Sequence, residues 1–123
     1  MGLDVYALRS PDDDLTEEDE RAFDEANIEL CGGIFSGSGG SFRGKVYDSL
    51  IFDLTGVSLY QLWIPPETVR QMAEALHRVD SEMFEKELVK KYSWEEYSAH
   101  TLENLCRFFD ICVERGLGLA GSW

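Results

Sequence analysis

Residues 93–116 have the sequence SWEEYSAHTLENLCRFFDICVERG, and this stretch contributes most to the expected fold. Ser93 and Glu96 have the spacing of a capping box, in which a hydroxyl and a carboxylate satisfy the first free N–H groups of a helix. Apolar residues then recur at helical spacing, and Gly116 supplies a typical helix end. We therefore predict a long amphipathic helix near residues 94–115, with one broad face packed against the rest of the chain.

The same helical spacing of apolar residues predicts further helices earlier in the chain. Thr16 and Ser41 are placed to cap two of them, because each hydroxyl precedes a helical stretch. Pro66 suits the first turn of a third helix, where no backbone N–H is needed. The expected helices lie near residues 16–26, 42–54, 66–79, 81–90 and 94–115.

Three short segments alternate in the manner of strands, with Val, Ile and Tyr among their residues. They lie near residues 3–9, 28–35 and 57–63. Their alternation with helices would allow parallel pairing through right-handed crossovers. We therefore expect a single α+β domain over residues 1–123, in which four to five helices pack on a small sheet of about three strands.

The chain is strongly acidic, with 24 Asp and Glu residues against 11 Lys and Arg residues and a formal net charge of −13. Nucleic-acid binding calls for clustered Lys and Arg, so this charge argues against it. It argues equally against docking on an anionic membrane surface. A basic protein partner fits the charge, although a high-salt host would account for it without any partner.

The cysteines and the first residues bear on the compartment. The chain has three cysteines, Cys31, Cys106 and Cys112, and an odd number without paired spacing does not indicate a disulfide framework. The start lacks the basic and apolar stretches of a signal peptide, and no apolar run reaches the roughly 18 residues of a membrane helix. We therefore expect a cytoplasmic protein with no membrane association.

Residues 36–45 form a glycine-rich loop that contains part of a phosphate-binding motif. Gly39 to Lys45 match G-x-x-x-x-G-K, in which backbone N–H groups cradle a phosphate. Val46 follows where the full motif needs Ser or Thr, so nucleotide hydrolysis is not favoured. Either the loop binds another anion or small ligand, or its two cations pair with acidic neighbours. The residues of the predicted ligand site are Ser38, Gly39, Gly40, Ser41, Arg43 and Lys45.

Two predicted helices carry carboxylates near a histidine at spacings that metal sites use. Glu74 is followed by His77 on one of them, and Glu96, His100 and Glu103 lie on the other. Helical geometry places these side chains on polar faces, where ion pairs between neighbours explain the pattern. We therefore expect no metal and no cofactor, with His77 and His100 as the alternative ligands.

A cysteine nucleophile is a third possibility for chemistry. Cys106 or Cys112, paired with His77 or His100, would supply a thiol and a base. A reactive thiol needs an electropositive and partly exposed setting, but both cysteines lie among apolar residues of the last predicted helix. Unreactive buried thiols are therefore the favoured interpretation.

Apolar residues also occur after the last predicted helix, in the tail 117–123. They are Leu117, Leu119, Ala120 and Trp123. Either the tail folds back over the core, or it meets a second copy of the chain in a homodimer. Folding back is the expected arrangement.

The start of the chain carries a short resemblance. Gly2-Leu3-Asp4 with Tyr6 resembles the beginning of small uncharacterised bacterial and phage proteins. The resemblance implies neither an activity nor a site residue.

Three functional hypotheses follow from these observations. The preferred one is a non-enzymatic acidic interaction module, of the inhibitor or immunity type, that covers a basic site on a protein partner. The second is an anion or small-ligand binding domain that uses the loop 36–45. The third is an enzyme with an unrecognised site around His77, His100 or the same loop.

Overall fold

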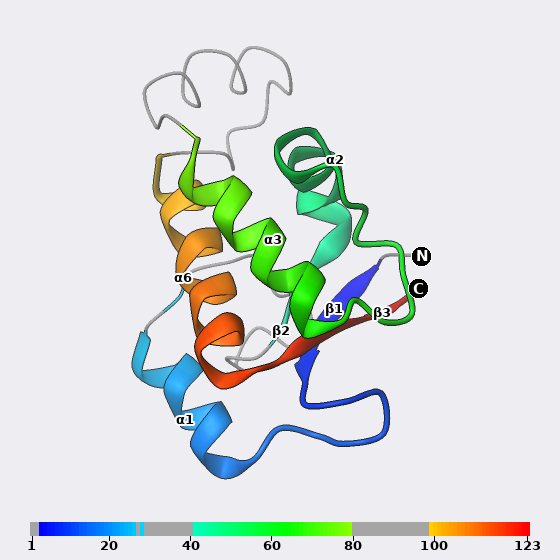
Figure 1. Ribbon diagram of the computed structural model, residues 1–123, viewed down its shortest axis with the longest axis vertical. Helices are drawn as coiled ribbons and strands as arrows, with labels where there is room; N and C mark the ends of the chain where they lie inside the picture. The colour runs from blue at the N-terminus through cyan, green and yellow to red at the C-terminus, as the bar shows by residue number, and fades with distance from the viewer. Residues whose placement is uncertain (1–2, 27, 29–40, 80–98) are drawn as a thin grey trace.

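The computed structural model describes residues 3–26, 28, 41–79 and 99–123, and Figure 1 labels its elements. Within these residues the chain is of the α+β class, with a small three-stranded antiparallel sheet and four helices. The elements are β1 (Asp4–Leu8), α1 (Glu17–Ala26), β2 (Ser41–Arg43), α2 (Gly44–Thr55), α3 (Pro66–His77), α6 (Ala99–Arg115) and β3 (Gly118–Ser122). In these ranges no helix has the length and apolar character needed to span a membrane.

β1 is the central strand of the sheet, which has the order β2-β1-β3. Val5 pairs with Phe42 on one side and with Gly121 on the other, and both pairings are antiparallel. Leu3, Val5 and Ala7 are buried while the residues between them are half-buried, so one face of the strand points into the core. The first predicted strand is thus confirmed, whereas its pairings are antiparallel and not the parallel ones that the order of elements would allow.

The third strand of the sheet is formed by the tail of the chain. Residues 57–63, which were expected to be a strand, run beside β3 as an irregular segment. Ile64 and Leu119 exchange two backbone hydrogen bonds of 2.7 and 2.9 Å, and the Gly121 N–H donates to the Gln61 oxygen at 3.0 Å. This segment therefore covers part of the outer edge of β3.

Glycine is required where the segment approaches β3. A Cβ on Gly118 would lie 2.6 Å from the Ile64 oxygen and from the Trp63 ring, and one on Gly121 would lie 2.6 Å from the Gln61 oxygen. Larger residues would not fit without a backbone shift, so close approach selects glycine here. Glycine has low strand propensity, and the alternation pattern therefore did not indicate this strand.

The ends of several helices agree with capping residues expected from the sequence. The Asp19 N–H donates to the Thr16 hydroxyl at 3.2 Å at the start of α1, and Pro66 occupies the first turn of α3. Gly56 and Gly116 follow α2 and α6 with φ of 77° and 69°. Only glycine adopts this left-handed conformation readily, which explains why both helices stop there.

The start of α2 differs from the prediction. The helix begins at Gly44, because Phe42 and Arg43 belong to β2. Ser41 pairs with Tyr6 in the sheet and is not the expected cap. Pairing with β1 therefore extends the sheet up to the first helical residue.

The remaining predicted elements divide between confirmed and undescribed segments. The helices near 16–26 and 66–79 are confirmed as α1 and α3, and the last helix is confirmed as α6 from Ala99 onward. Outside the described residues lie the predicted strand near 28–35, apart from Ile28, and the predicted helix near 81–90. The expected capping box of Ser93 and Glu96 at the start of the last helix lies outside them as well.

Aromatic rings form the centre of the core. Phe108 of α6 contacts Phe23 of α1 and Phe42 of β2, with ring centroids 4.9 Å apart in both pairs. α3 lies beside α6 in Figure 1 and buries Met72 and Leu76. Burial of each of these apolar side chains stabilises the fold by roughly 1.5–3 kcal/mol. The contacts of Phe108 also connect elements that are far apart in the sequence.

Candidate functional site

Asp19 is a fully buried carboxylate in the first turn of α1. Its backbone N–H donates to the Thr16 hydroxyl, and its Oδ2 accepts the Thr16 N–H at 3.0 Å. This is a reciprocal capping arrangement, with Asp in the place of the usual Glu or Gln. The local sequence thereby aims the carboxylate back toward the chain that precedes the helix.

Two arginines from distant elements contact this carboxylate. Arg9, just after β1, donates from Nε at 2.7 Å and from Nη2 at 2.8 Å. Arg115, the last residue of α6, donates from Nε at 2.5 Å. Burial alone would raise the pKa of Asp19, but the hydrogen bonds from Arg115, Thr16 and Arg9 together hold that pKa well below its ordinary value. The carboxylate is therefore ionised at neutral pH.

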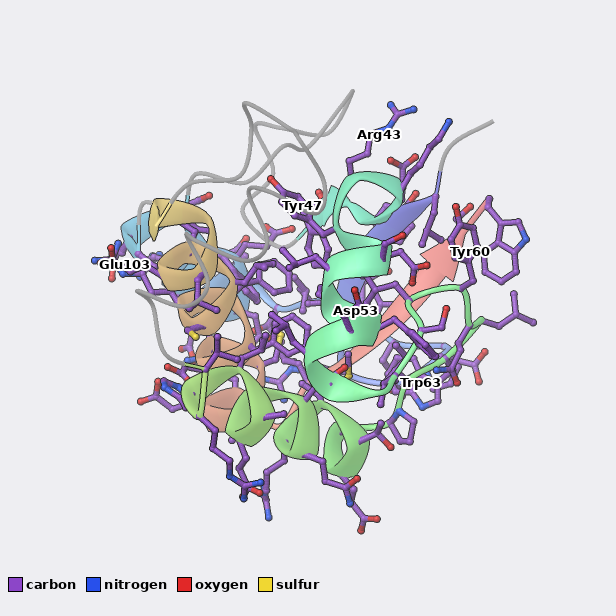
Figure 2. The ribbon with its side chains drawn as sticks, turned by 90° about the horizontal axis from the view of Figure 1, so that it is seen from above. Arg43, Tyr47, Asp53, Tyr60, Trp63 and Glu103 are labelled. Carbon is purple, nitrogen blue, oxygen red and sulfur yellow. The ribbon has the colours of Figure 1, made fainter. Side chains whose placement is uncertain are left out.

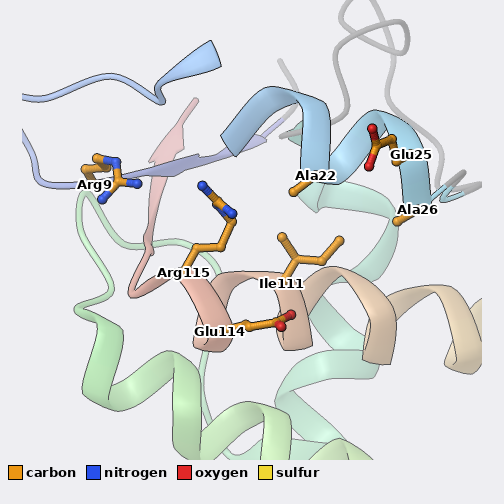
Figure 3. A pocket seen from close by; sticks show the side chains of 7 residues that line it. All are labelled: Arg9, Ala22, Glu25, Ala26, Ile111, Glu114 and Arg115. Atoms are coloured by element: carbon orange, nitrogen blue, oxygen red, sulfur yellow. The ribbon is translucent and has the colours of Figure 1, made fainter. Parts of the chain in front are cut away.

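A hollow of about 570 Å³ opens beside the two arginines, between α1 and the C-terminal part of α6 (Figure 3). Arg9 and Arg115 line it, as do the exposed carboxylates Glu25 and Glu114. In Figure 3 the arginines lie toward one end of the hollow and Glu25 lies toward the other. The rim thus carries two arginines at one end and Glu25 at the other, with Glu114 between them.

The hollow also has an apolar lining between its charged ends. Ala22 and Ala26 contribute it from α1, and Ile111 contributes it from α6. All three are half-buried, so their side chains are in part open to solvent. A ligand with an aliphatic body would bury this surface on binding.

The outer surface of α1 and the loop before it concentrate negative charge. Residues 12–25 contain nine acidic residues and one basic residue, Arg21. Asp19 is buried, and the other eight carboxylates are exposed. We call these eight the acidic face: Asp12, Asp13, Asp14, Glu17, Glu18, Glu20, Asp24 and Glu25.

The predicted ligand loop is only partly described. Ser38, Gly39 and Gly40 lie outside the described residues. The Lys45 backbone N–H donates to the Leu3 oxygen at 3.2 Å, so it is engaged within the fold. The side chain of Arg43 projects outward from the start of α2 in Figure 2. An anion site at this loop therefore stays a prediction.

Gly44 of the same motif has a packing role. A Cβ at this position would lie 2.6 Å from side-chain atoms of both Leu3 and Val5. The glycine therefore lets the start of α2 approach β1 closely. This role accounts for one glycine of the motif without any ligand.

One of the two histidines, His77, pairs with a carboxylate of another helix. His77, at the end of α3, places Nε2 2.7 Å from Oδ1 of Asp110 on α6, and both side chains are about half-exposed. This pair between two helices was not expected from the sequence. The side chain of His100 lies outside the description. Among the described residues no group of three or more His, Cys, Asp or Glu side chains could hold a metal ion.

The cysteines of α6 are poorly suited to act as nucleophiles. Burial, with a contribution from the Asp110 charge, raises the pKa of Cys106 to about 11. Complete burial raises the pKa of Cys112 as well. Both therefore hold their protons at neutral pH, when a nucleophile would have to be a thiolate. Cys31 is outside the described residues.

The tail folds back over the core, as expected, and Leu117 and Leu119 are fully buried. Trp123 at its end is 55% exposed, and its ring meets Tyr60 edge-on at 5.6 Å. Leu62, from the same segment as Tyr60, is 79% exposed. A homodimer, the alternative for this tail, would therefore be formed by Trp123 and the segment 57–63, because Leu117 and Leu119 are buried in the core.

Comparisons with known proteins give no match to this chain among family models, curated proteins or solved structures. The resemblance of the first residues to small bacterial and phage proteins accordingly stays a prediction. A functional proposal has to rest on the acidic face, on the Asp19 cluster and on the hollow beside it.

Proposed function

We propose that this protein is a non-enzymatic interaction module whose acidic face binds a basic surface on a protein partner. The observation that carries the proposal is the concentration of eight exposed carboxylates within residues 12–25. By contrast, α3 carries Glu67 and Glu74 against Arg70, and Arg78 follows at its C-cap, so the charges there are nearly balanced. The negative charge of the chain is therefore localised, as electrostatic docking requires.

Helix stability does not account for the acidic face. Carboxylates in the first turn of α1 suit the positive end of the helix dipole. Asp24 and Glu25 lie at the opposite end, where the last turn contains no basic residue. Glu20 and Asp24 are also like charges four residues apart, which weakens a helix. Carboxylates that destabilise their own helix are better explained by a role in binding a partner.

The Asp19 cluster supports this role by fixing the orientation of α1. Hydrogen bonds from Arg9 and Arg115 connect the start of the helix to the end of β1 and to the end of α6. A face held in place before binding loses less conformational freedom when a partner docks. An inhibitor or immunity-like protein that covers a basic site would benefit from such preorganisation.

Capture of partners from a lysate of the host, with matched charge variants, tests the proposal. Glu20→Lys with Asp24→Lys alters the acidic face, and Glu67→Lys with Glu74→Lys makes the same charge change on α3. We expect a protein that the wild type and the α3 variant retain but the α1 variant loses, with retention falling steeply as salt increases. Equal capture by both variants, or capture that salt leaves unchanged, would contradict the acidic face as the binding surface.

A further inference from the structure

The hollow between α1 and α6 has features that docking through the acidic face does not use. At its cationic end, each guanidinium group has five N–H donors. Asp19 accepts two hydrogen bonds from Arg9 and one from Arg115. Nη2 of Arg115 also lies 3.9 Å from Oε2 of Glu18, and both groups keep donors beyond these contacts. The two arginine side chains are 41% and 28% exposed, and both line the hollow.

Asp19 also holds both guanidinium groups in place before any ligand arrives. Arg9 is fixed through two of its nitrogens and Arg115 through one. A planar guanidinium group that is already oriented recognises a carboxylate through paired hydrogen bonds. The cationic end is therefore suited to the carboxylate of a ligand.

The opposite charges elsewhere on the rim limit which ligands fit. Glu25 and Glu114 suit an ammonium group, and the apolar lining lies among these charges. A simple anion would approach a protein of net charge −13 against repulsion. A simple cation would leave the arginine donors unused. A molecule with both charges satisfies both sets of side chains.

We propose that this hollow binds a small zwitterion, with a carboxylate at the arginines, an ammonium group at the glutamates and a short aliphatic chain over the apolar lining. The volume of about 570 Å³ lies within the range of roughly 300–1,000 Å³ that is usual for small-ligand sites. This site shares Glu25 with the acidic face, but it does not depend on the proposed docking function.

An NMR titration of the full chain labelled with ¹⁵N tests the site, with 6-aminohexanoate as the probe. Hexanoate and hexylamine, each with one of the two charges, are the controls at equal ionic strength. We expect saturable shifts of amides in residues 22–26 and 111–115, with binding of each control at least about tenfold weaker. Absence of saturable shifts overturns the proposal, and so does equal binding of either control.

A variant at a residue that makes no hydrogen bond to Asp19 provides the second test, although the Glu114 charge acts on Arg115. Glu114→Gln removes one carboxylate from the rim, and Glu74→Gln on α3 is the matched control. We expect Glu114→Gln to weaken 6-aminohexanoate about tenfold while hexanoate binding stays the same, and we expect Glu74→Gln to change neither. Unchanged affinity of Glu114→Gln for the zwitterion would contradict the assigned ammonium position, provided that its spectrum stays that of a folded chain.

Discussion

Asp19 connects three parts of the chain through one carboxylate. It caps α1 locally, and it contacts arginines at the end of β1 and at the end of α6. A buried charge is stable only when it is paired and hydrogen-bonded. The geometry meets both conditions, so this residue affects stability, the orientation of the acidic face and the proposed zwitterion site together.

We predict that Asp19→Asn lowers the free energy of unfolding by about 2 kcal/mol at neutral pH, because both arginines lose charge-assisted hydrogen bonds. Urea unfolding followed by circular dichroism measures this change. Asp24→Asn, on the exposed surface of the same helix, is the control and should change stability by less than about 0.5 kcal/mol.

This difference between wild type and Asp19→Asn should also depend on pH. The folded-state pKa of Asp19 lies well below the ordinary value of 3.8, so the unfolded chain binds the proton first as the pH falls. The stabilisation by Asp19 is therefore complete above the ordinary pKa of 3.8. It is lost as the pH falls from there toward the lower pKa of the folded state. A difference that persists unchanged down to about pH 2 would contradict the role of the ionised carboxylate.

At the scale of elements, β3 depends on glycines that allow close approach of another segment. We predict that Gly118→Val destabilises the protein by about 2 kcal/mol, because a side chain would meet the Ile64 oxygen and the Trp63 ring. Thermal unfolding measures the loss. Ser122→Val, at the exposed end of the same strand, should be tolerated, and an equal loss in both variants would show that β3 does not require glycine for packing.

Local signals predicted the helices well and the strands poorly. Thr16, Pro66 and Gly56 determine helix ends through groups within a few residues, and α1, α3 and α2 begin or end there. A strand depends on its partner, so the apolar segment 57–63 lies outside the sheet while the glycine-rich tail joins it.

In the candidate site, too, the local feature could be predicted from the sequence and the long-range contacts could not. The capping position of Thr16 is apparent in the sequence. The partnership of Asp19 with Arg115 spans 96 residues, and no local pattern brings such distant residues together. The hollow beside them follows from this tertiary contact and was therefore not predicted.

At the scale of the whole molecule, the acidic face concentrates more negative charge than the dipole of α1 accounts for. Net charge far from zero favours solubility but destabilises a compact chain through repulsion. Increasing NaCl from about 0.01 M to about 1 M shortens the screening length roughly tenfold. The wild-type protein should therefore become more stable as salt increases, because repulsion within the acidic face is screened.

Asp24→Lys separates folding from binding at this face. At low salt we expect it to stabilise the protein by about 0.5 kcal/mol, because a cation suits the C-terminal end of α1 and pairs with Glu20 four residues earlier. The gain should shrink as salt increases, and thermal unfolding at both salt concentrations measures it. Glu74→Lys, which places a cation next to Arg78 at the end of α3, should give no gain. A loss of stability in Asp24→Lys would mean that the acidic face serves the fold, whereas a gain together with loss of the captured partner would mean that the negative charge is retained for binding.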